Sequence, residues 1–83
     1  MPNAPGFAAM KARRMRSLLE RELGYTAKPG TGGSHRKLEA EGRPTLIFAF
    51  HDGAEVGPAL VRSILVKQVG LTLEEAKQVV KRG

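Results

Sequence analysis

The sequence contains no cysteine and no tryptophan, and its aromatic residues are three phenylalanines and one tyrosine. The lack of cysteine excludes disulfide bonds and thiolate metal sites, and it fits a reducing cytoplasm. No apolar run approaches the roughly 20 residues of a membrane-spanning helix, and the first residues lack the apolar stretch of a secretory signal. We therefore expect a cytoplasmic protein that does not enter a membrane.

The chain is short and basic. A length of 83 residues predicts one domain with a small core, which excludes a cofactor-binding fold and disfavours a deep substrate pocket. Lysine and arginine number 14 against 8 acidic residues, for a net charge of +6, and most of this excess lies in the first half. Such a charge favours an anionic partner, although many small domains are basic for solubility alone.

The N-terminal part predicts a loose lead-in over residues 1–7, where two prolines and a glycine occur, and a single domain over residues 8–83. A helix is expected over residues 8–23, ended by Gly24. Arg13, Arg14, Ser17 and Arg21 lie on the side opposite its apolar stripe, either as a solvated face or as a line of phosphate contacts. The stripe consists of Ala8, Ala12, Met15, Leu18, Leu19 and Leu23.

The middle of the chain predicts three strands, over residues 25–28, 34–40 and 45–51, with a glycine-rich loop before the second. The last two strands read as a hairpin. We prefer the register that places His35 opposite His51 and Lys37 opposite Ala49, because a one-residue slip mixes charged and apolar groups on both faces. A shift by two residues keeps the same faces. The expected core face holds Leu38, Ala40, Leu46, Phe48 and Phe50.

The C-terminal part predicts two helical segments. Gly57-Pro58 starts the first, Gly70 ends it, and the pattern from Thr72 to Glu75 is a capping box that starts the last helix over residues 73–81. The fold class is therefore α+β: a helix, a three-stranded antiparallel sheet, then one long bent helix or two short ones packed on one face. The buried side of the first segment is expected to contain Leu60, Val61, Ile64 and Leu65.

The segment from Gly32 to Lys37 carries the most chemical information, because flexible glycines precede His35 and two cations. A single histidine at a strand start is often a bystander. Here, however, the only two histidines share the face that is not core, and imidazole can donate or accept a proton near neutral pH. RNA suits this chemistry because its 2′-hydroxyl is an internal nucleophile. The sequence shows no metal-ligand pattern, serine triad or P-loop, so we expect no cofactor.

The order of several motifs resembles the HicA family of bacterial toxin–antitoxin systems over about residues 10 to 80. The resemblance implies a double-stranded-RNA-binding-like fold, metal-independent cleavage of mRNA, and neutralisation by a HicB-like antitoxin. It implies that His35 is catalytic and that His51 is the family's second histidine, although Phe50 stands where members often have proline. The motifs are Gly33-Ser34-His35, a strand ending at His51, Leu60-Val61-Arg62-Ser63-Ile64-Leu65 and Gly70-Leu71-Thr72-Leu73-Glu74-Glu75.

Three functions remain open on these residues. The leading one is an endoribonuclease toxin in which His35 transfers a proton and His51 is a possible second acid or base. The second is a module that grips double-stranded RNA without cutting it, for which His35 is unnecessary. The third is a protein-interaction domain with an acidic partner. The residues expected to contact phosphate or RNA are Gly33, Ser34, Arg36, Lys37, Lys28, Arg14 and Arg21.

Overall fold

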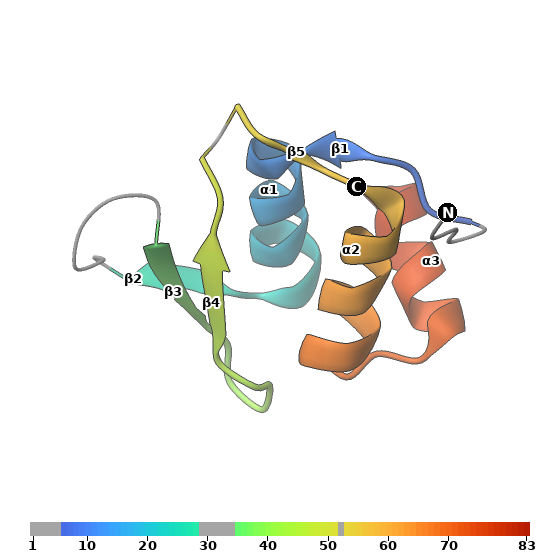
Figure 1. Cartoon of the computed structure of the whole chain (residues 1–83). Helices are drawn as coiled ribbons and strands as arrows, with labels where there is room; N and C mark the ends of the chain where they lie inside the picture. The colour runs from blue at the N-terminus through green and yellow to red at the C-terminus, as the bar shows by residue number, and fades with distance from the viewer. Residues whose placement is uncertain (1–5, 29–34, 52) are drawn as a thin grey trace.

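The computed structural model describes residues 6–28, 35–51 and 53–83, and it confirms the predicted α+β class (Figure 1). The main helix precedes a three-stranded antiparallel sheet, and the remaining helical segments follow it. In chain order the elements are β1 (Met10–Lys11), α1 (Ala12–Leu23), β2 (Thr26–Lys28), β3 (His35–Glu39), β4 (Leu46–Ala49), β5 (Glu55–Val56), α2 (Pro58–Arg62), the π-helical segment η1 (Ser63–Gln68) and α3 (Leu73–Arg82).

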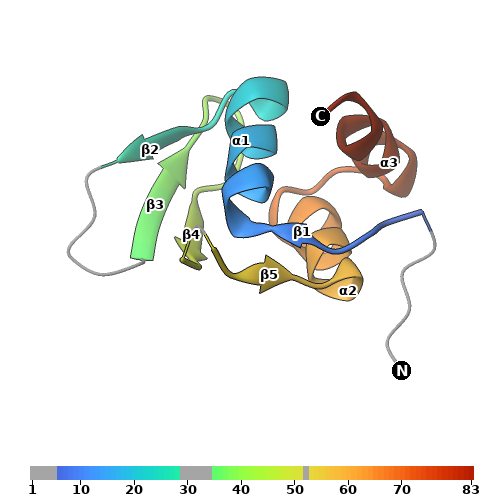
Figure 2. The ribbon, with the colours of Figure 1, turned by 90° about the horizontal axis from the view of Figure 1, so that it is seen from above.

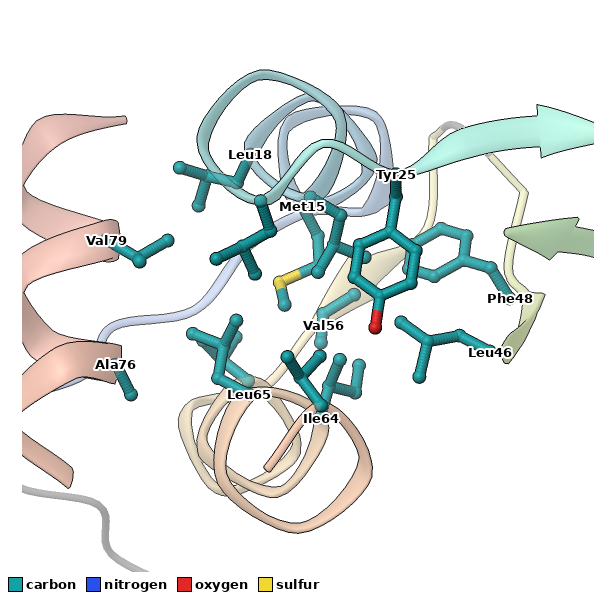
Figure 3. Close-up of a cluster of buried hydrophobic side chains, with 14 of the residues drawn as sticks. Met15, Leu18, Tyr25, Leu46, Phe48, Val56, Ile64, Leu65, Ala76 and Val79 are labelled. Carbon is teal, nitrogen blue, oxygen red and sulfur yellow. The ribbon is translucent and has the colours of Figure 1, made fainter. Parts of the chain in front are cut away.

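The core lies between one face of the sheet and the helices. Strands β2, β3 and β4 pair in chain order, and Leu46 and Phe48 on the inner face pack with Met15 of α1 and Ile64 of η1 (Figure 3). Helix α3 packs on the far side of α1 from the strands (Figure 2), where Ala76 and Val79 complete the core. Burial of this shared apolar surface is the main favourable term in folding.

The hairpin has the predicted faces but not the predicted register. Lys37 pairs with Ile47 rather than Ala49, and His35 pairs with Ala49 rather than His51, a shift of two residues. The hairpin reverses earlier in the chain than predicted, at a β-turn in which the Arg43 N–H donates to the Ala40 carbonyl over 3.2 Å and Gly42 adopts a φ of 74°. Side chains alternate with a period of two, so this shift leaves each one on its expected face.

The start of α1 differs from the prediction. The helix begins at Ala12, because Met10 and Lys11 instead form an antiparallel pair with Val56 and Glu55 of β5. Ala8, expected on the buried stripe, is therefore exposed before the helix, whereas Phe7 is buried in the core. The other five members of the predicted stripe are buried, and Gly24 ends the helix with a left-handed φ of 76°.

The C-terminal helices follow the predicted boundaries closely. Pro58 begins α2, which continues without a break into η1, where the Val69 N–H reaches back five residues to the Ile64 carbonyl over 2.9 Å. Val61, Ile64 and Leu65 are buried as expected, but Leu60 is 37% exposed. The capping box is confirmed: the Glu75 N–H donates to Thr72 Oγ1, and the Thr72 N–H donates to Glu75 Oε1.

The buried and exposed faces of the hairpin predict different costs for two substitutions on its strands. Leu38→Ala should lower the free energy of unfolding by about 2–5 kcal/mol, because it leaves a cavity at a fully buried position. Ile47→Ala, at a position 59% exposed, should cost less than about 1 kcal/mol. Urea unfolding measures both. Equal costs, or a greater cost at Ile47, would mean that the opposite face of the hairpin packs on the helices.

Candidate functional site

The residues singled out by the sequence fall at several places in the fold. Gly33 and Ser34 lie outside the described residues. His35 is the first residue of β3, and its backbone lies opposite Ala49 near the end of β4. Strand β3 is the central strand of the sheet. Its pairing with β4 fixes the backbone position of His35, and Lys37, Leu38 and Glu39 pair with β2 as well.

The outer face of the sheet carries a cationic cluster. Lys28 of β2 and Lys37 of β3 lie directly opposite each other, an arrangement that is repulsive unless an anion lies nearby. Glu39 supplies that anion, with its two carboxylate oxygens 3.9 Å from Lys28 Nζ and 3.7 Å from Lys37 Nζ. All three side chains are about half exposed, so these ion pairs are screened and add little stability. We call Lys28, Lys37 and Glu39 the sheet-face cluster.

Arg36 does not join the sheet-face cluster. It lies opposite Phe48 and shares the strand alternation of the buried Leu38, and it is only partly exposed. Arg36 and Lys37, adjacent in the sequence, are both predicted to contact phosphate or RNA. The structure instead places these two cations on opposite faces of β3, because neighbouring side chains on a strand point in opposite directions.

His51 is exposed and lies two residues beyond the end of β4. Its carbonyl accepts a hydrogen bond from the Ala54 N–H over 2.9 Å, so it begins the turn that leads to β5. The predicted opposition of His35 and His51 across the hairpin is therefore wrong. The two-residue shift in register places Ala49, not His51, opposite His35.

Arg14 and Arg21 lie elsewhere. Both line a hollow formed by α1 and the end of α3, together with Arg82. Figure 2 shows α3 on one side of α1 and the strands of the sheet on the other. The predicted cations thus form two groups, one on the sheet and one on the helices. Arg82 was not singled out by the sequence, where the only signal for it was a basic last turn of the final helix.

The shifted pKa values in the described residues belong to structural groups. Burial raises the pKa of Tyr25, whose hydroxyl donates to the Pro44 carbonyl over 2.8 Å and holds the hairpin turn against the end of α1. Hydrogen bonds from Thr72 lower the pKa of Glu75 in the capping box. Neither group lies in the sheet-face cluster.

Two further features bear on the kind of site. Among the described residues, no cluster of histidine, aspartate and glutamate side chains has the arrangement of a metal site. Over the same residues, no helix is both long and apolar enough to cross a bilayer. What the described surface does offer is cations on an open sheet face and between two helices.

Comparison with known proteins adds a family match. The sequence model of the family described as HicA toxin of bacterial toxin-antitoxin matches residues 12–71. No curated protein and no solved structure matches the chain. The matched range contains α1, the three strands of the sheet, α2 and η1, and it ends before α3.

The single carboxylate of the sheet-face cluster, Glu39, is predicted to weaken the binding of RNA to the two lysines. Glu39→Gln should leave Lys28 and Lys37 without an anion, so RNA should bind more tightly and the slope of log affinity against log salt should steepen by up to about one unit. Fluorescence anisotropy with a labelled RNA measures both, with His35→Ala in every protein compared, because the sequence predicts that this variant does not cut RNA. Glu74→Gln, with the same charge change on α3, is the control. Equal shifts in the two variants would show that RNA does not contact the cluster.

Proposed function

This chain belongs to the HicA family of toxins from bacterial toxin–antitoxin systems, and from this premise we propose that it is an endoribonuclease that cuts mRNA. The observation that carries the proposal is the position of His35. It follows Gly33 and Ser34 directly and begins the central strand, on the same alternation as Lys37 of the sheet-face cluster. A basic, open sheet face suits a long polymer better than a small molecule.

The proposed reaction uses the RNA's own 2′-hydroxyl. A base removes the 2′ proton, the 2′ oxygen forms a bond to phosphorus, and the bond from phosphorus to the 5′ oxygen breaks as an acid protonates that oxygen. The product ends in a 2′,3′-cyclic phosphate. We assign one of the two proton transfers to His35. Lys37 and Lys28 stabilise the negative charge that develops on the phosphorane.

The reaction needs a second group that transfers a proton, and we assign this step to His51 or to a water molecule. His51 is exposed and available to an RNA that crosses the end of β4. It does not lie opposite His35 across the hairpin, so the two histidines act on one phosphate only if the RNA lies between them. Substitution of each histidine separately decides this point, because loss of one of two proton-transfer groups slows the reaction without affecting binding.

The first test concerns His35. His35→Ala should abolish growth arrest on induction and reduce RNA cleavage by about 100- to 10,000-fold, because a proton-transfer group contributes that much to the rate. RNA binding and the unfolding midpoint should stay unchanged, and cleavage by the unmodified protein should persist in EDTA. His51→Ala is run in parallel. Undiminished cleavage by folded His35→Ala would reject the catalytic role, and RNA binding without any cleavage by the unmodified protein would favour the double-stranded-RNA-binding module.

The second part of the proposal is that an antitoxin inhibits the toxin by binding directly over the active site. Membership of the family implies an antitoxin partner, and we propose a HicB-like protein whose acidic surface covers His35 and the sheet-face cluster. Complementary charge would speed the encounter and fix the orientation of the complex. An open face that admits RNA is equally open to such a cover, since both ligands bring negative charge to the same lysines.

The complex with a co-encoded antitoxin should therefore protect His35 from chemical modification. Treatment with a histidine-modifying reagent, read by mass spectrometry, should label His35 in the free toxin and not in the complex. Lys37→Gln should weaken the complex, whereas Lys67→Gln, an exposed lysine on η1, should not. If His35 is labelled equally in both states while cleavage is fully blocked, the antitoxin acts indirectly and direct cover is wrong.

A further inference from the structure

A line of polar side chains runs along the outer side of α1 toward its C-terminal end. Arg14, Ser17 and Arg21 follow one another at intervals of three and four residues, which places them on one face of the helix. Seven residues separate the two arginines, a rise of roughly 10 Å along the axis. This length is enough to meet more than one phosphate of a nucleic-acid backbone.

The end of α3 forms the second wall of a hollow on this face. Arg82 Nε lies 2.9 Å from Glu22 Oε1, which joins the last turn of α3 to α1, and Gly83 lies against Leu18. Two adjoining hollows, of about 150 Å³ and about 560 Å³, share Arg14, Ser17, Arg21 and Gly83. We call this combined site the helix hollow. Its further lining includes Lys11, Arg13, Glu22 and Arg82.

The charge of the helix hollow is strongly unbalanced. Five cationic side chains line it against one acidic side chain, Glu22, which already accepts a hydrogen bond from Arg82. Within the described part of the chain, no carboxylate forms an ion pair with Arg14 or Arg21. Cations gathered in a concave surface concentrate positive potential there, and a bound anion relieves their mutual repulsion.

The helix hollow is distinct from the proposed catalytic face. It opens on the side of α1 that faces α3, whereas the sheet-face cluster lies on the strands on the other side of α1 (Figure 2). The family match covers the α1 side of the hollow, whereas Lys11, Arg82 and Gly83 lie outside residues 12–71.

We propose that the helix hollow is a second binding site, which holds phosphates of the RNA backbone away from the point of cleavage. This inference depends on the proposed function in one respect, because it takes the bound anion to be the backbone of the RNA substrate. Arginine suits this role because its planar guanidinium donates two parallel hydrogen bonds to phosphate oxygens. The Ser17 hydroxyl, between Arg14 and Arg21, adds a neutral donor. RNA held here and cut at the sheet must pass around α1, so short RNAs cannot use both sites.

The Arg82–Glu22 ion pair provides the sharpest test, because its two partners should act in opposite directions. Arg82→Gln removes a cation and should weaken RNA binding, whereas Glu22→Gln removes the only acidic side chain of the lining and should strengthen RNA binding. A purely structural ion pair would move both variants the same way, because either substitution breaks it. Anisotropy with a labelled RNA duplex of about 20 base pairs, longer than the roughly 16 that a double-stranded-RNA-binding domain spans, measures both in a His35→Ala background.

Salt dependence tests the arginines of α1. Arg14→Gln with Arg21→Gln should reduce the slope of log affinity against log salt by about two units, so the loss of affinity between about 50 and 200 mM salt should be roughly tenfold smaller than for the parent protein. Arg43→Gln with Lys67→Gln changes the net charge equally at exposed positions outside the hollow and should leave the slope unchanged. With cleavable RNA, the α1 double variant should raise KM and preserve kcat.

Two results would overturn the proposal while leaving the endoribonuclease assignment intact. One is an unchanged salt slope in the folded α1 double variant. The other is unchanged RNA binding together with a weakened antitoxin complex, which would make the helix hollow a protein interface. Conversely, if His35→Ala still cuts RNA, the assignment of His35 fails, and the binding measurements still decide the helix hollow independently.

Discussion

Burial of one face of a three-stranded sheet is the constraint on which the rest of this structure depends. Leu38, Leu46 and Phe48 pack against α1 and η1, and side chains alternate along a strand, so Lys37 and Ile47 must face outward. The apolar contacts outweigh the ion pairs of the sheet-face cluster, which are half exposed and screened. A basic open face at the start of β3 is thus a consequence of core packing, and the position of His35 follows from it.

The same core extends beyond the family match through α3. Ala76 and Val79 are buried with residues of α1 and η1, and the capping box fixes where α3 begins. Because α3 packs beside α1, the basic end of α3 is brought to the polar side of α1 and forms the helix hollow. Helix α3 thus shares one cluster of buried side chains with α1, η1 and the sheet.

Separation of the two cationic sites suits a small RNA-cutting protein. A domain of this size buries too little to build a deep pocket, so the proposed RNA substrate would be held by contacts spread over the surface. Phosphate contacts at the helix hollow would supply affinity without sequence preference. The sheet face would then be free to hold the reacting phosphate. Both surfaces are cationic because few carboxylates lie near them, and Glu39 and Glu22 each already pair with a cation.

The sequence by itself determined the features that depend on neighbouring residues. The apolar stripe of α1, the stop at Gly24, the capping box at Thr72 and the two faces of the hairpin all follow from local spacing and local backbone preference. These signals hold because a helix or strand repeats its geometry every few residues. The candidate histidine and the lysines of the strands could be chosen on the same basis, together with the family resemblance.

Only the tertiary structure decided which distant residues meet. Both registers of the hairpin bury the same face, so the sequence pattern could not choose between them. The observed register, with its turn at Gly42, no longer places His35 opposite His51. The β1–β5 pair and the exposure of Leu60 depend on packing between segments far apart in the chain. The helix hollow depends on α3 lying beside α1. Periodicity records the faces of each element, but it contains no information on which faces are placed together.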